Sequence, residues 1–160
     1  MNKSTTNFHA LRACWVALAC VSGSSCIHAA IACDITSAAL AFGMYDPSSY
    51  SPTDGVGTVN LSCTNFMTAA PNGASLALTI SPASNRKMTG NGHALNYGVY
   101  SNSARSLNWG DGSAAPMLST GAMQANETKP LRFTLYGRIP PLQNIVAGNY
   151  ADSLLITITP

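Results

Sequence analysis

The stretch that decides the fold is the last one in the chain, Tyr150-Ala-Asp-Ser-Leu-Leu-Ile-Thr-Ile-Thr-Pro160. Its apolar and polar residues alternate, which predicts a β-strand with Leu154, Ile156 and Ile158 on one face. Chain ends fray unless something holds them, so an apolar strand in this place needs a partner strand. That partner need not belong to the same chain.

The opposite end of the sequence has the features of a targeting segment. Lys3 and Arg12 give a positive start before an apolar run over residues 13–21. This run is too short to cross a bilayer as an uncleaved anchor. Ala30-Ile-Ala32 fits the small-residue pattern of a cleavage site. We therefore expect a secretory signal over residues 1–32 and a single domain over residues 33–160, with cleavage after Ala30 as the alternative.

Removal of the signal leaves two cysteines, Cys33 and Cys63. A pair of cysteines in an exported chain predicts one disulfide formed in an oxidising compartment. Closing a loop of this length contributes about 3–4 kcal/mol by chain entropy. A metal site is not expected, because His93 is the one histidine and no third cysteine is left. No cofactor is expected either.

Charge argues against nucleic acid as a partner. Residues 33–160 hold six basic and six acidic side chains, and the excess of the whole chain comes from Lys3 and Arg12. The basic residues form no stripe of the kind that nucleic acid requires. Few charges among many Ser, Thr, Asn and Gly residues are typical of extracellular β-proteins.

Short alternating segments recur through the domain and predict an all-β sandwich. Besides the final strand, they cover residues 58–63, 76–80, 94–100 and 131–136, with a weaker one over 35–42. The gaps carry turn residues at Asp46-Pro47, Asp54-Gly55, Pro71-Asn-Gly73, Gly90-Asn-Gly92, Gly110-Asp-Gly112 and Pro140-Pro141.

Candidate chemical groups are isolated. Asp111 lies in Trp109-Gly-Asp-Gly112, which fits a glycine-rich turn better than a calcium loop, because a calcium loop needs more acidic oxygens. His93 has no nucleophile pattern beside it, and no known catalytic motif occurs. We expect neither an enzyme nor a small-molecule substrate. Core packing explains most of the aromatic residues, although a sugar-binding surface is the alternative for seven of them: Tyr45, Tyr50, Tyr97, Tyr100, Trp109, Tyr136 and Tyr150.

Six blocks of sequence, in order, together resemble the spore coat protein U domain family, which includes the subunits of archaic chaperone–usher pili. The blocks are Cys33 with Phe42-Gly-Met-Tyr-Asp-Pro47; Gly57-Thr-Val-Asn-Leu-Ser-Cys63; Arg86-Lys-Met88; Leu95-Asn-Tyr-Gly-Val-Tyr100 with Ala104-Arg105 and Trp109-Gly-Asp-Gly112; Tyr136-Gly-Arg-Ile-Pro140; and Gly148-Asn-Tyr-Ala-Asp152 before the last strand.

This resemblance implies an incomplete immunoglobulin-like β-sandwich that lacks its last strand and is completed by a donated one. The partners it implies are a periplasmic chaperone, an outer-membrane usher and other pilus subunits. Leu154, Ile156 and Ile158 would form one wall of the strand-acceptor groove. Basic residues of the chaperone would hold the terminal carboxylate of Pro160. The expected location is the periplasm in transit, then a fibre or coat at the cell surface.

Two features depart from this family pattern. Cleavage after Ala32 leaves no residues before Cys33 to donate as a strand, so either cleavage is earlier or the subunit accepts a strand without donating one. Pro160 stands where family members often end in an aromatic residue. The first departure and the tyrosines together motivate an alternative function, a tip adhesin that binds carbohydrate or a surface.

Overall fold

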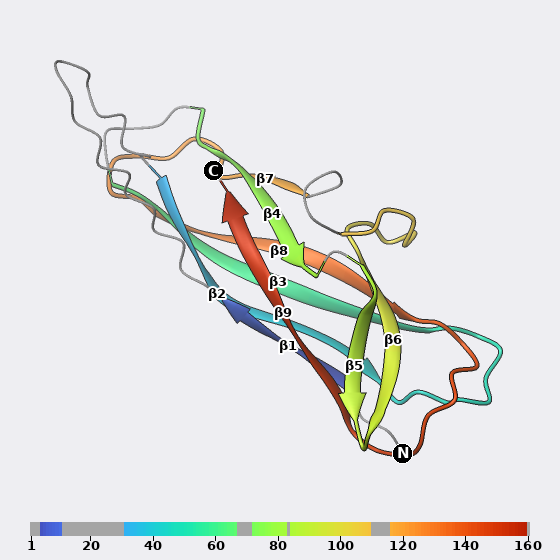
Figure 1. Cartoon of the computed structure of the whole chain (residues 1–160). Coiled ribbons are helices and arrows are strands. Elements are labelled where there is room, and N and C mark those ends of the chain that lie inside the picture. The colour runs from blue at the N-terminus through green and yellow to red at the C-terminus, as the bar shows by residue number, and fades with distance from the viewer. Residues whose placement is uncertain (1–3, 11–30, 67–71, 83, 110–115, 160) are drawn as a thin grey trace, which may run out of the picture.

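A computed structural model of the chain describes residues 4–10, 31–66, 72–82, 84–109 and 116–159. These residues form strands and turns, and no helix occurs among them. None of this part of the chain therefore forms a helical membrane span. The strands are β1 Ser4–Ala10, β2 Ile31–Gly43, β3 Thr53–Asn65, β4 Ser75–Ser81, β5 Arg86–Gly90, β6 His93–Tyr100, β7 Met117–Ser119, β8 Thr128–Ile139 and β9 Tyr150–Thr159 (Figure 1).

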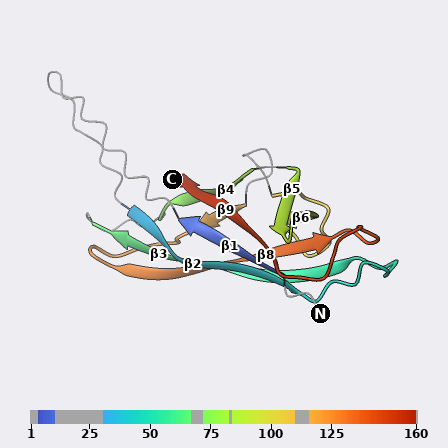
Figure 2. The same ribbon diagram turned by 60° about the horizontal axis from the view of Figure 1, so that its bottom comes forward.

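The strands form two layers that face each other across the core. In one layer β3 lies between β2 and β8, antiparallel to both. In the other layer β4 pairs antiparallel with both β9 and the short β7. The β5–β6 hairpin links the layers, because β6 pairs with β8 while Thr89 of β5 pairs with Ala151 of β9. Figure 2 shows β3 and β8 below β4 and β9.

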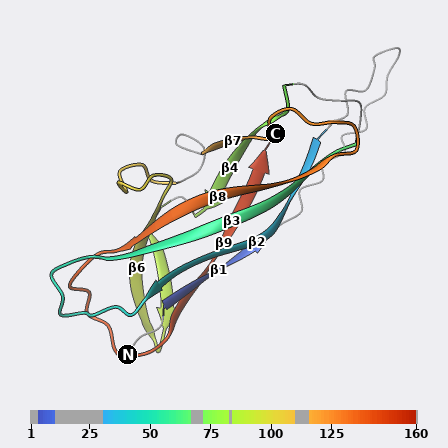
Figure 3. The ribbon, with the colours of Figure 1, turned by 180° about the vertical axis from the view of Figure 1, so that it is seen from behind.

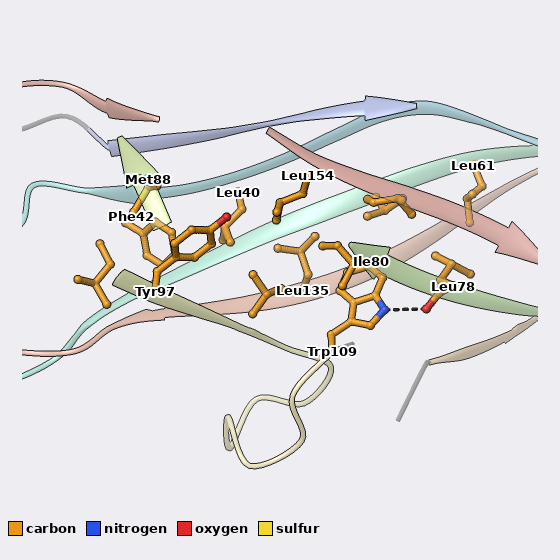
Figure 4. Close-up of a cluster of buried hydrophobic side chains, with 14 of the residues drawn as sticks. Leu40, Phe42, Leu61, Leu78, Ile80, Met88, Tyr97, Trp109, Leu135 and Leu154 are labelled. Atoms are coloured by element: carbon orange, nitrogen blue, oxygen red, sulfur yellow. Dashed lines mark hydrogen bonds between the residues drawn. The ribbon is translucent and has the colours of Figure 1, made fainter. Parts of the chain in front are cut away.

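The core takes one face of each predicted strand, as the alternating patterns predict. The fully buried side chains from these strands are Leu40, Val59, Leu61, Cys63, Leu76, Leu78, Ile80, Leu95, Val99, Leu135, Tyr150, Leu154 and Ile156. Trp109, which follows β6, is fully buried, and its indole N–H donates a hydrogen bond to the Leu78 carbonyl at 2.7 Å (Figure 4). The strand predictions for residues 35–42, 58–63, 76–80, 94–100, 131–136 and 154–159 are confirmed.

The disulfide prediction is also confirmed. Cys33 of β2 lies directly opposite Cys63 of β3, and their sulfur atoms are 2.05 Å apart. Cys63 is fully buried and Cys33 is half-buried. The bond therefore joins the first two strands of the predicted domain at the edge of the core.

One predicted turn is wrong. Asp54 and Gly55 lie inside β3, where they pair with Arg138 and Gly137 of β8. The physical reason is the aromatic ring of Phe42, which packs over both glycines. A Cβ atom added at Gly55 or Gly137 would lie 2.9 Å and 2.4 Å from that ring. Glycine here makes room for a side chain rather than for a turn.

The turn predicted at Gly90-Asn-Gly92 is confirmed as the two-residue loop of the β5–β6 hairpin. Asn91 and Gly92 have φ angles of 49° and 75°, which suit the turn types that close tight hairpins. The sequence pattern predicts neither β5, because Arg86 and Lys87 obscure its alternation, nor the three-residue β7.

The first strand, β1, lies in the segment predicted to be a secretory signal. It runs antiparallel to β2 and parallel to β9, and so fills the space between them (Figure 3). Within residues 33–160 no described strand bridges β2 and β9. The all-β fold is thus consistent with an incomplete immunoglobulin-like β-sandwich. Removal of the signal concerns processing of the chain and stays a prediction, as does the domain division at residue 33.

Candidate strand-acceptor groove

The candidate site is the space between the facing edges of β2 and β9, which we call the acceptor groove. β1 occupies it with both edges paired: Thr5, Thr6 and Asn7 lie opposite Ala41, Leu40 and Ala39 of β2. On the other side, Ser4 to Ala10 lie opposite Tyr150 to Ile156 of β9. A strand in this groove therefore satisfies backbone groups of both layers at once.

The wall formed by β9 is mostly apolar. Tyr150, Leu154 and Ile156 each have about one hundredth of their surface exposed, and Ile158 is partly buried against the same core. Three of these four residues, Leu154, Ile156 and Ile158, are the ones predicted to line the groove. Their role in strand binding stays a prediction.

The wall formed by β2 is apolar as well. Leu40 is fully buried and Phe42 nearly so. The Phe42 ring meets the Tyr97 ring edge to face, with centroids 5.6 Å apart. Figure 4 shows Leu40, Leu154 and Tyr97 turned into the same cluster from β2, β9 and β6. Residues far apart in sequence thus form one continuous surface beneath the inserted strand.

The acceptor groove extends beyond β1. In the described residues no strand pairs with the β1-facing edge of β2 before Ala39, or with that edge of β9 after Ile156. Ile35, Ala38 and Ile158 in this extension are only partly buried. A strand longer than the seven residues of β1 could therefore bury more apolar surface here.

One carboxylate interrupts the apolar row of β9. Asp152 lies between Tyr150 and Leu154 in the alternation, and its Oδ2 accepts a hydrogen bond from the Tyr97 hydroxyl at 2.8 Å. Its Oδ1 accepts a second bond from the Ser153 backbone N–H, also at 2.8 Å.

A buried cation lies near this carboxylate. Arg86 is the cross-strand partner of Tyr97, and 3% of its surface is exposed. Its Nη2 donates to the Trp109 carbonyl at 2.5 Å, and its Nε has no partner among the described residues. Burial lowers the pKa of Arg86, while Tyr97 and Asp152 oppose that shift. Sequence reasoning missed this cluster, although the acidic residue in the inward row of the last strand was its visible signal.

The other residues singled out from the sequence lie elsewhere. Asp111 and Pro160 are outside the described residues. His93 is exposed at the start of β6, and the described part of the chain holds no group of three metal-ligating side chains. Most of the candidate sugar-binding aromatics belong to the core, since Tyr45, Tyr97, Trp109 and Tyr150 are buried; Tyr50, at 86% exposure, is on the surface.

The chain is similar to known proteins over most of its length. The sequence model of the Spore Coat Protein U domain matches residues 17–157. The chain belongs to the Spore Coat Protein U domain family. It is also 30% identical to Protein U of Myxococcus xanthus, in an alignment that covers 80% of this chain and 77% of that protein. The family membership supports a structural protein of coat or pilus type with an extracellular or surface location.

Proposed function

We propose that this protein is a non-enzymatic subunit of a surface pilus, fimbria or coat, assembled by donor-strand complementation. In this proposal a periplasmic chaperone first supplies a strand to the acceptor groove, and an outer-membrane usher then exchanges it for a strand of another subunit. The Spore Coat Protein U domain supports the structural role, and the acceptor groove supports the mode of assembly.

The observation that carries the proposal is the origin of the strand in the groove. β1 comes from the predicted signal, whereas β9 and all of β2 except its first two residues, Ile31 and Ala32, belong to residues 33–160. Once the signal is removed, the same groove lacks an occupant from the remaining described strands. The edges of β2 and β9 then expose unpaired backbone groups above an apolar floor, which is a template for a strand from another chain.

The proposal assigns this subunit the accepting role. Cleavage after Ala32 would leave Cys33, which is already paired within β2 and β3, as the first residue. No segment would then be free to serve as a donor. Mass spectrometry of the exported protein tests this point: we expect a mature N-terminus at Cys33, and a start ten or more residues earlier would restore a donor role.

The experiment that tests the function supplies the missing strand within the same chain. Residues 4–10 are appended after Pro160 through a Gly/Ser linker long enough to run back along β9, about 33 Å for ten residues. The matched control carries the same extension with Phe8→Asp, which places a charge opposite Leu154. Both are co-expressed with the periplasmic chaperone and usher of the host.

The proposal predicts that the protein without an extension co-purifies with the chaperone and enters surface fibres. The intact extension should keep the subunit monomeric and free of chaperone, because the groove is already filled. The Phe8→Asp control should bind the chaperone again. Equal chaperone binding by all three versions, or binding by none, would contradict assembly through this groove.

A further inference from the structure

The groove wall formed by β9 contains a position with different chemistry from its neighbours. Among the β9 residues that face the core, Tyr150, Leu154 and Ile156 are almost fully buried and mostly apolar. Asp152, which lies between Tyr150 and Leu154 in this row, is half-buried and acidic. An acidic side chain in such a row is costly unless it is hydrogen-bonded. Asp152 therefore needs hydrogen-bond donors around its carboxylate, whereas the apolar wall positions do not.

The described residues hold the Asp152 carboxylate in place but do not saturate it. The Tyr97 hydroxyl and the Ser153 N–H each donate one bond to it, whereas two carboxylate oxygens offer about four acceptor sites. Tyr97 is 5% exposed and is fixed by the edge contact with Phe42, so the carboxylate has a rigid support. The remaining acceptor capacity is open to a further donor.

The register places one residue of the inserted strand beside this carboxylate. Thr6 of β1 lies directly opposite Asp152 on one side and Leu40 on the other. Directly opposed residues in neighbouring strands are about 5 Å apart at their Cβ atoms and share a face of the sheet. Any strand that fills the groove in this register has Asp152 as a neighbour at that position.

We propose that Asp152 selects the strand: the groove favours an occupant with a hydrogen-bond donor, namely a hydroxyl, amide or ammonium group, at the position between Leu40 and Asp152. This inference rests on the proposed function, since it concerns the partner of the same groove. A donor satisfies the open acceptor sites, whereas an aliphatic group covers them without a partner and a carboxylate adds repulsion between like charges. The occupant therefore combines this donor with apolar residues at the positions opposite Leu154 and Ile156.

The test uses the full chain, residues 1–160, produced without export so that β1 is retained, and refolded under oxidising conditions. Thr6→Asp places a second carboxylate opposite Asp152, and Thr6→Lys places an ammonium group there. Asn7→Asp is the matched control, because its neighbours Ala39 and Ser153 are exposed. Each is also made together with Asp152→Asn, and thermal unfolding midpoints are compared.

We expect Thr6→Asp to lower the midpoint by about 2–4 °C, with Thr6→Lys and Asn7→Asp close to the parent. Asp152→Asn should remove most of the loss caused by Thr6→Asp and leave the effect of Asn7→Asp unchanged. The inference is overturned if Thr6→Asp behaves like Asn7→Asp and does not respond to Asp152→Asn.

A further variant distinguishes failure of the selection by Asp152 from failure of strand binding in the groove. Phe8→Ser removes an apolar group opposite Leu154 and reports whether β1 fills the groove at all. If Phe8→Ser lowers the midpoint while Thr6→Asp behaves like its control, the groove accepts a strand and only the selection by Asp152 is wrong. If Phe8→Ser also has no effect, the groove model of assembly fails together with the inference.

Discussion

At single positions, an aromatic ring packs directly over the neighbouring strands of its own layer because glycine lies beneath it. Phe42 covers the cross-strand pair of Gly55 and Gly137, and the Tyr97 ring packs against its edge. This contact explains why glycine occurs in the middle of strands, where its conformational freedom is otherwise a cost. It also connects two of the sequence blocks that carry the family resemblance.

We predict that Gly137→Ala destabilises the protein by about 1–3 kcal/mol, because the new Cβ would overlap the Phe42 ring. Urea unfolding measures the loss. Phe42→Leu is the matched second change: in the Phe42→Leu background Gly137→Ala should cost much less, since the ring is gone. Equal costs of Gly137→Ala in both backgrounds would show that the ring is not the reason for the glycine.

A second residue-scale prediction concerns Asp54, which binds two arginines on the outer side of β3 and β8. Arg138 donates to both carboxylate oxygens, at 2.7 Å and 2.9 Å, and Arg105 lies 3.2 Å away. The Arg138 hydrogen bond first, and then the charges of Arg105 and Arg138, lower the pKa of Asp54 against the opposing effect of burial. Because the folded-state pKa is below the ordinary value, the stabilisation is present in full above about pH 3.9 and is lost as the pH falls through the folded-state pKa.

Asp54→Asn should therefore lower the unfolding midpoint modestly at pH 7, since the pair is partly exposed to solvent. The difference from the parent should shrink as the pH drops below the ordinary aspartate pKa. Thermal unfolding of both proteins from pH 7 down to pH 2.5 checks this. A constant difference over the whole range would mean that the carboxylate charge does not contribute.

At the scale of the elements, the disulfide fixes the strand that borders the acceptor groove. Cys33 and Cys63 hold the start of β2 to β3, and before Ala39 this part of β2 has no described partner on its groove side. We predict that Cys33→Ser lowers the free energy of unfolding by about 2–5 kcal/mol. Urea unfolding with and without a reductant measures it: the reductant should destabilise the parent and leave the variant unchanged. A variant as stable as the oxidised parent would contradict this role.

The sequence predicts most of these elements because a half-buried strand shows itself by alternation alone. Leu76, Leu78 and Ile80 give β4 without reference to any other segment. Long-range relations are not visible in this way. Neither the contact of Phe42 with Gly137 nor the hydrogen bond of Tyr97 to Asp152 joins residues that are near in sequence. β5 was missed for a related reason, since its buried Arg86 is compatible with the core only because Trp109 accepts its hydrogen bond.

At the scale of the whole molecule, the sandwich is complete only when a strand lies between β2 and β9. The described strands of residues 33–160 supply both walls and the floor of the acceptor groove, and β1 supplies the strand from outside that domain. We expect a sandwich with this groove empty to expose part of Leu40, Leu154 and Ile156, which are buried in the structure. Exposed apolar surface next to open strand edges favours association with another chain.

The most direct measurement of this claim is equilibrium unfolding of oxidised residues 33–160, alone and with residues 4–10 appended through the long linker. We expect the domain alone to aggregate or to lack a cooperative transition, and the extended version to be a monomer that unfolds cooperatively. The Phe8→Asp extension should resemble the domain alone. A monomeric domain that unfolds cooperatively without any added strand, at the midpoint of the extended version, would contradict the account.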